Sequence, residues 1–466
     1  MILIVCFQMF IVYSLIATSR RGLENALPLF CFYLTLMPLE SRLIIPGVFD
    51  LNTMRISLTT LFLLFLIQRK GTARKVIPLK NLMVLHGTWA IFSVSYSISS
   101  ATSAKQIISQ VVEYYLMYYI FVKTISSKQT LHSIVYAMMM AVGVCCIFSV
   151  IEVYAKWSIL RIFPSDLWIT YNGGIDPLYV EWGRGLRVRS TFPHPILFGD
   201  ALAMSIPLTL YLISIWQDRF QRRVLWVTLA LMFWSLYKTT SRGPWIATIL
   251  CCGLLYCLIH NRVRRYLLVI MGVASSALLA RPGVLQTVKG LYQSSTDPSS
   301  PVGASYLYRD ALLTSIIEAV GKDPGRMLLG FGLGTFREKG LDILFLGSLQ
   351  HWYTCDNNWA AFLYETGYVG LILIGLLLLA ALNIAFKSYR QRSGLDWQLS
   401  GVIFISLLGF YILLYSVAGY SWGQQGYMAW ILIALAGSAQ QGVRMERFAA
   451  KTNSASVDEE MMLYAT

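Results

Sequence analysis

The sequence predicts an all-α polytopic membrane protein with about 12 to 13 transmembrane helices and one long outer loop that carries short helices. Of its 466 residues, 56% are hydrophobic and only 13% are charged, and the mean hydropathy is +0.59. A soluble core of this length could not bury so much apolar surface. Apolar segments close to the ~20 residues that a helix needs to cross a bilayer also recur along the whole chain.

We expect membrane-spanning helices over residues 1–18, 26–45, 56–67, 81–97, 107–122, 131–154, 196–216, 224–239, 244–259, 266–280, 359–385, 398–418 and 427–438. The first segment has the length of a signal peptide. No charged residues precede it, however, and no small-residue cleavage site follows, so we interpret it as a span.

Lysine and arginine indicate the orientation, because basic short loops resist translocation. Alternate short loops carry the basic residues, as in Arg20 and Arg21 or Arg222 and Arg223. This pattern predicts an outer N-terminus and an inner C-terminus, with residues 441–466 as a polar inner tail. The net charge of +15 is mostly a topology signal and does not predict nucleic-acid binding.

Two outer loops, 155–195 and 281–358, contain arginines that the orientation rule does not require. Arg187 and Arg189 lie in the first loop and Arg309 lies in the second. Arg242, in "TTSRGPW" (239–245), stands at the outer end of a span. An arginine at that depth costs free energy unless it pairs with an anion or reaches the interface.

The second long loop has a helical pattern of its own. In "SYLYRDALLTSIIEAVGKDPG" (305–325) the apolar residues repeat at helical spacing, and Lys322-Asp-Pro-Gly ends the helix. Arg309 precedes Leu312 and Leu313 by three and four residues, which places it on the buried stripe. It either pairs with a nearby carboxylate or binds an anion. "GFGLGTF" (330–336) lacks a surrounding βαβ unit, so we expect a tight turn there rather than a dinucleotide site.

The stretch "HWYTCDNNW" (351–359) brings a polar cluster to the mouth of the next span. Asp356 and Asn357 could cap the helix that follows, since Asp and Asn are favoured N-caps. Asp356 could also act as a general base, because apolar surroundings raise the pKa of a carboxyl group. His351 could reach the same site if the loop folds back. Glu365 lies about 13 Å further along the helix and is expected to support an arginine.

Cysteine and acidic spacing indicate neither a disulfide framework nor a metal site. Of the eight cysteines, only Cys355 falls outside the predicted spans, on the outer side. One outer thiol cannot form an intramolecular disulfide. The chain has no zinc-type Cys/His spacing and no Asp-x-Asp pair, so we expect neither a metal nor a cofactor.

Four motifs, in order, carry a resemblance to a known family: "RVRSTFPHPILFG" (187–199), "TTSRGPW" (239–245), "YRDALLTSIIEAVGKDPGRMLLGFGLGTF" (308–336) and "DNNWAAFLYETGYVG" (356–370). They resemble motifs of the O-antigen ligase and Wzy-type polysaccharide polymerase superfamily, of the Wzy C-terminal domain type. The resemblance covers residues 185–440. It implies N-terminal transmembrane helices over 1–154, periplasmic loops over 155–195 and 281–358, a catalytic region over 185–440 and a cytoplasmic tail over 441–466.

The resemblance implies a GT-C-like membrane glycosyltransferase of the bacterial inner membrane. Such enzymes transfer glycan from undecaprenyl pyrophosphate on the periplasmic face, either to another lipid-linked unit or to lipid A core. Family arginines bind the pyrophosphate without a metal, and here Arg189, Arg242 and Arg309 match them, with Arg187 and Asn357 as support. The implied partners are the lipid-linked glycan donor, a glycan or lipid acceptor and the bilayer. Other polysaccharide export proteins are candidate partners.

One departure from the family pattern bears on the reaction. The ligase motif has His, then Asn, Ser or Gln, nine residues, and Gly-x-x-Gly. Here Asp356 stands where the family has that histidine, and Gly367-Tyr-Val-Gly370 keeps the spacing. The expected activity is therefore exopolysaccharide or O-antigen polymerisation, with O-antigen ligase as the alternative. A lipid-linked oligosaccharide flippase or exporter is the rival of another class, but its charges should line a central cavity.

Overall fold

The computed structural model describes residues 2–44, 50–68, 76–168, 176–181, 185–259, 261–279 and 301–440 of the chain. The cytoplasmic tail predicted over 441–466 lies outside these residues. The same holds for residues 281–300 of the second long loop and for 169–175 and 182–184 of the first.

The protein is mostly helical. Its longer helices are α1 (Ile2–Ser19), α2 (Leu27–Leu36), α3 (Thr53–Ile67), α4 (Lys80–Val94), α5 (Ser100–Ser109), α6 (Met117–Thr124), α7 (Lys128–Tyr154), α8 (Pro195–Ile215), α9 (Arg219–Lys238), α10 (Arg242–Leu258), α11 (Asn261–Leu279), α13 (Pro301–Gly321), α16 (Asn358–Arg390) and α17 (Trp397–Leu413). A further helix covers 424–440. Among the described helices, α1, α7, α8 and α16 are long and apolar enough to cross a membrane. The prediction of a multi-pass α-helical membrane protein is therefore confirmed.

Each predicted span coincides with helical structure, but the spans 26–45, 81–97 and 398–418 end three or more residues earlier than predicted. The span 26–45 is helical only over Leu27–Leu36, after which the chain forms the short pair β1 (Arg42–Leu43) and β2 (Leu51–Asn52). The span 398–418 ends at Leu413, because the next residues turn toward the start of α16. A π-helical turn, Gln110–Leu116, joins α5 to α6.

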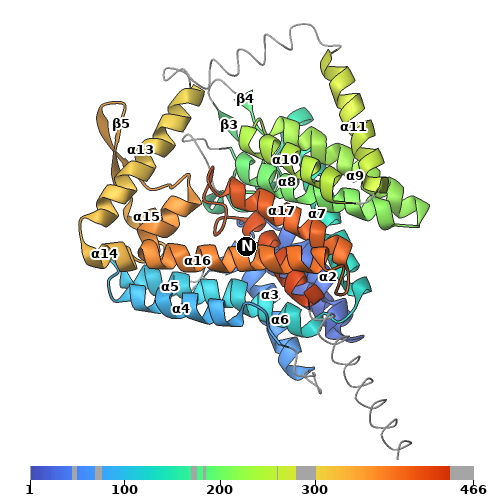
Figure 1. Cartoon of the computed structure of the whole chain (residues 1–466), viewed down its shortest axis with the longest axis horizontal. Helices are drawn as coiled ribbons and strands as arrows, with labels where there is room; N and C mark the ends of the chain where they lie inside the picture. Colours follow the sequence, from blue (N-terminus) through green and yellow to red (C-terminus); the bar gives the residue numbers. More distant parts are fainter. Residues whose placement is uncertain are drawn as a thin grey trace, which may run out of the picture.

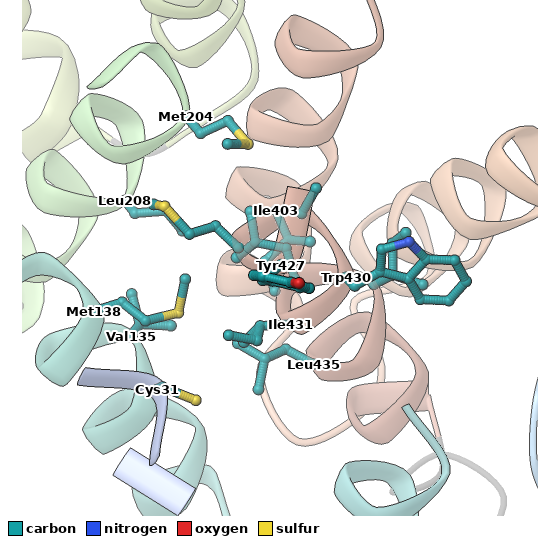
Figure 2. Close-up of a cluster of buried hydrophobic side chains, with 14 of the residues drawn as sticks. Cys31, Val135, Met138, Met204, Leu208, Ile403, Tyr427, Trp430, Ile431 and Leu435 are labelled. Atoms are coloured by element: carbon teal, nitrogen blue, oxygen red, sulfur yellow. The ribbon is translucent and has the colours of Figure 1, made fainter. Parts of the chain in front are cut away.

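The core of the helical bundle forms where α7, α8, α17 and the helix 424–440 meet. Figure 2 shows Met138 of α7 and Met204 of α8 on one side, facing Ile403 of α17 and Ile431. All four side chains are fully buried or nearly so. Helix α8 is buried along most of its length, so it is the central helix on which the neighbouring elements are assembled.

Residues 301–352 of the second long loop fold into a small unit at one end of α16, seen at the left of Figure 1. We call it the outer unit. It contains α13, α14 (Pro324–Leu329), α15 (Thr335–Lys339) and an antiparallel hairpin of β5 (Leu341–Phe345) and β6 (Ser348–Trp352). Leu312, Ile316 and Val320 of α13 form a small core with Ile343 and Leu363. The helical stripe predicted for α13 is thereby confirmed, and Arg309 lies beside it.

A kink in α16 explains the glycine-rich motif. Gly367 has φ +67°, and a Cβ there would lie 2.3 Å from the carbonyl oxygen of Leu328. The kink frees carbonyl groups, which accept hydrogen bonds from the backbone N–H of Phe331 (to Tyr364, 2.8 Å) and Gly332 (to Glu365, 2.9 Å). "GFGLGTF" is therefore a tight turn, as predicted, and it joins the outer unit to the broken helix.

Candidate functional site

The predicted site residue Arg309 contacts one short segment, residues 414–420, which follows α17. The starts of α10 and α16 also lie against this segment. The start of α16 is tied to both ends of it. The backbone N–H of Asn358 donates to the carbonyl of Leu414 at 2.7 Å, and the N–H of Tyr420 donates to Oδ1 of Asn358 at 2.9 Å. The residues just before α16 are thereby held beside the 414–420 segment.

Arg309 reaches the same segment from α13. Its Nη2 donates to the backbone carbonyl of Ser416 at 3.0 Å, and its side chain is half-buried. The start of α10 lies against the same residue, since a Cβ at Gly243 would lie 3.3 Å from Oγ of Ser416. Ser416 therefore joins Arg309 to the first turn of α10, where Arg242 is the first residue.

Arg187 fixes the turn that precedes Arg242. The side chain of Arg187 is buried, and it donates from Nε to the carbonyl of Thr239 at 2.9 Å and from Nη2 to Oγ of Ser241 at 2.8 Å. Its third contact is an ion pair with Glu181. Because Thr240 has a positive φ, the turn is strained, and these hydrogen bonds stabilise it. Arg187 thus positions Arg242.

Asp356 lies at the entrance to α16, beside Arg309. Burial raises the pKa of the Asp356 carboxyl group, and the positive charge of Arg309 lowers it. Because burial has the larger effect, the net shift is upward. A carboxylate whose pKa is raised accepts a proton more readily than an ordinary aspartate does.

The N-cap of α16 is Asn357, and not Asp356. Oδ1 of Asn357 accepts hydrogen bonds from the backbone N–H groups of Trp359 at 3.0 Å and Ala360 at 3.2 Å. Asn358 points elsewhere, to Tyr420. The three polar residues at this junction therefore differ in role. Asn357 caps α16 and Asn358 binds the 414–420 segment, whereas the carboxylate of Asp356 takes neither role.

Comparison with known protein families identifies this region. Residues 227–375 match the family model described as O-Antigen ligase (Wzy_C). This part of the chain is similar to O-antigen ligases, which confirms the resemblance. No curated protein matches the chain. The matched residues include Arg242, Arg309 and Asp356, and they lie within the range 185–440 over which the resemblance was expected.

Arg189, expected to bind pyrophosphate, lies before the residues matched by the family model and is deeply buried. Its guanidinium donates to the carbonyl of Pro177 from Nε at 3.0 Å and from Nη2 at 2.6 Å, and to the carbonyl of Pro193 from Nη1 at 2.9 Å. These contacts hold the chain that leads into α8.

His351 lies on β6 of the β5–β6 hairpin. Its Nδ1 is 2.7 Å from Oδ1 of Asp342, and its Nε2 is 2.9 Å from the carbonyl oxygen of Lys339. The hydrogen bond with Asp342 raises the pKa of His351. The side chain is exposed, and both ring nitrogens are engaged by this hairpin.

Glu365 supports the outer unit through backbone groups. Its carboxylate accepts hydrogen bonds from the N–H groups of Gly334 and Phe336 at the start of α15, where we had expected an arginine partner. Among the residues that the structure describes, no group of three His, Cys, Asp or Glu side chains could hold a metal ion.

Asp200 is a site candidate that sequence reasoning missed. It is fully buried in α8, and neither carboxyl oxygen has a hydrogen-bond partner in the described parts of the chain. Its Oδ2 would lie 3.6 Å from a Cβ at Gly419, so the carboxyl group of Asp200 lies close to the 414–420 segment. The sequence could have indicated Asp200, since it is the one acidic residue in the predicted span 196–216.

Proposed function

We propose that this protein is a membrane glycosyltransferase that polymerises glycan units carried on undecaprenyl pyrophosphate. The match to the O-antigen ligase family supports transfer of a lipid-linked glycan. The observation that carries the proposal is the meeting of Asp356, Arg309 and the first turn of α10 around the 414–420 segment. A proton acceptor and two guanidinium groups are what such a transfer requires.

In the proposed reaction, the carboxylate of Asp356 takes the proton of the acceptor hydroxyl. The acceptor oxygen then bonds to the anomeric carbon of the donor glycan as the bond between that carbon and the pyrophosphate oxygen breaks. Negative charge accumulates on the leaving pyrophosphate. The guanidinium groups of Arg242 and Arg309 stabilise this charge with bidentate hydrogen bonds, so this mechanism requires no metal ion.

The positions of the other arginines support assigning the pyrophosphate to Arg242 and Arg309. Arg189 uses its guanidinium on the carbonyls of Pro177 and Pro193, and Arg187 uses its own on the turn before Arg242. Both are therefore proposed as positioning residues. His351 is held by Asp342 and Lys339, which favours Asp356 as the base.

Polymerase is preferred over ligase because of the residue at position 356. The ligase motif has a histidine there, whereas this chain has an aspartate. The O-antigen ligase description of the family keeps ligation to lipid A core as the second candidate. Deleting the gene separates the two. Accumulation of single-repeat lipid-linked glycan supports the polymerase, whereas long polymer that stays on the lipid carrier supports the ligase.

We also propose that the site faces the periplasm of a bacterial inner membrane, with the N-terminus outside and the C-terminus in the cytoplasm. Leu346 at the tip of the β5–β6 hairpin is 66% exposed, and Arg219 at the start of α9 is also exposed. In a background where Cys6 and Cys257 are replaced by serine, Leu346→Cys should react with a membrane-impermeant thiol reagent in whole cells. Arg219→Cys should react only after lysis. The reverse pattern would contradict this orientation.

A further inference from the structure

A second group of arginines lies at the end of α16 that is far from Asp356. Here Arg264, Arg390 and Arg392 line a cavity of about 390 Å³, together with Tyr389, Trp397, Gln398 and two apolar residues. The cavity is formed where the end of α10, the start of α11, the end of α16 and the start of α17 meet. Since none of the lining residues that the structure describes is acidic, the cavity is suited to an anion.

The three arginines are held differently. Arg264 donates from Nε to the carbonyl of Tyr256 at 2.7 Å and from Nη2 to the carbonyl of Cys257 at 2.9 Å, so it forms a fixed wall. The guanidinium carbon of Arg392 lies 5.7 Å from the centre of the Trp397 ring. Arg390 is exposed.

The carboxylate of Asp396 is held by partners other than these arginines. Asp396, next to Trp397, is buried and accepts hydrogen bonds from His132 Nε2 at 2.7 Å and from the hydroxyl of Tyr211 at 2.6 Å. It also forms an ion pair with Lys128 at 3.2 Å. The charge of Asp396 is therefore stabilised by side chains of α7 and α8, which do not line the cavity.

A mostly apolar stripe, interrupted by the exposed Asn383, leads along α16 to the cavity. Ile372, Leu376, Leu379 and Phe386 are 58%, 48%, 61% and 37% exposed, and Arg390 follows Phe386 by one helical turn. Positions spaced in this way share one face of a helix. Tyr389 and Trp397 lie at the polar end of this face, where aromatic residues mark the membrane interface. The stripe and the cavity thus match the acyl chains and the headgroup of one lipid.

We propose that this cavity binds the phosphate headgroup of an anionic phospholipid, with an acyl chain along the stripe of α16. Basic pockets between transmembrane helices are suited to such headgroups, and a planar guanidinium recognises phosphate oxygens in a bidentate manner. On the proposed orientation the lipid belongs to the cytoplasmic leaflet. The site is remote from Asp356 and independent of the proposed reaction.

The test uses the full chain in phosphatidylcholine nanodiscs, with phosphatidylglycerol added and its binding followed by native mass spectrometry. The double variant Arg390→Gln/Arg392→Gln should bind phosphatidylglycerol on the order of tenfold more weakly than the unaltered chain. Arg390→Gln alone should lose less, in the same direction. The matched control is Arg219→Gln/Arg223→Gln, which removes two exposed charges at the start of α9 and should bind as the unaltered chain does.

Each other outcome overturns the proposal. Equal weakening in the cavity and control variants would indicate diffuse attraction by surface charge. Unchanged binding in the cavity variants would exclude the site. Displacement of phosphatidylglycerol by an equal concentration of inorganic phosphate would indicate a soluble phosphate ligand instead of a lipid. A common elution volume and thermal midpoint in phosphatidylcholine alone establish that all variants are folded.

Discussion

The Nη2 atom of Arg309 donates a hydrogen bond to the backbone carbonyl of Ser416 at 3.0 Å. This contact links the outer unit of α13 to the turn after α17, two segments more than one hundred residues apart in the sequence. Ser416 also lies against Gly243, so Ser416 contacts both Arg309 and the first turn of α10, which begins with Arg242.

Arg309→Lys should lower the rate of glycan transfer on the order of 10²-fold, because lysine provides a point charge where a guanidinium both holds Ser416 and binds phosphate oxygens. Transfer is measured in proteoliposomes with lipid-linked repeat units. Arg337→Lys is the matched control, since Arg337 is exposed on α15 of the same unit. An Arg309→Lys enzyme that is as active as this control would remove Arg309 from the pyrophosphate site.

Arg242→Lys and Arg187→Met should fail in different ways. Lysine at 242 keeps the charge but loses bidentate recognition, so activity should fall on the order of 10²-fold while the thermal midpoint stays. Methionine at 187 removes the ion pair with Glu181 and releases the turn at Thr239 and Ser241. A buried group that loses its hydrogen-bond partner costs about 1–3 kcal/mol, so thermal stability should fall together with activity. Both quantities are measured on the same purified samples, and an unstable Arg242→Lys protein would contradict this assignment.

Gly367→Ala should detach the glycine-rich turn from α16. Alanine at φ +67° is strained by about 1–2 kcal/mol, and its Cβ would meet the carbonyl of Leu328. Limited proteolysis should then cut the outer unit faster. Gly375→Ala on the same helix is the control, because a Cβ there meets nothing within 4 Å and alanine favours a helix. Equal proteolysis of the two variants would show that the kink does not hold the outer unit.

Periodicity and hydropathy predicted the helices well, because each span must be apolar along its own length. α13 was predicted for the same reason, from Leu312, Ile316 and Val320. The ends of α2 and α17 were placed too late, since apolar residues continue into turns that pack on neighbouring helices. The β5–β6 hairpin was missed, although Leu346 and Gly347 have the positive φ values of a two-residue hairpin turn.

Sequence alone could not assign the roles of the site residues, because these roles depend on which groups each side chain contacts in the fold. Asn357 and Asp356 were both plausible caps, and only the backbone geometry assigned that role to Asn357. Apart from the ion pair of Arg187 with Glu181, the partners described above for Arg187, Arg189 and Arg309 are backbone carbonyls and a hydroxyl. Such partners have no sequence signature, so the residue type alone could not separate anion binding from structural support.

The pH dependence of transfer should follow Asp356. Burial raises the pKa of Asp356 and Arg309 opposes this shift, so the rate should fall as the pH is lowered through a pKa above the ordinary value of about 3.9. Arg309→Gln removes the opposing charge, and the acidic limb should therefore move to higher pH. A pH–rate profile in proteoliposomes measures both positions. An acidic limb that stays in place would separate Arg309 from the base.

Asp356→Asn compared with Asn357→Ser tests the central claim most directly. Serine caps a helix about as well as asparagine, so Asn357→Ser should cost a few tenths of a kcal/mol and leave the glycan chains at normal length. An amide at position 356 cannot take a proton, so transfer should fall by a factor on the order of 10² to 10⁴. The measurement is the glycan length distribution in deletion cells that express each variant at equal protein level. The account predicts single repeat units with Asp356→Asn and long polymer with Asn357→Ser. Long polymer from both variants would contradict it.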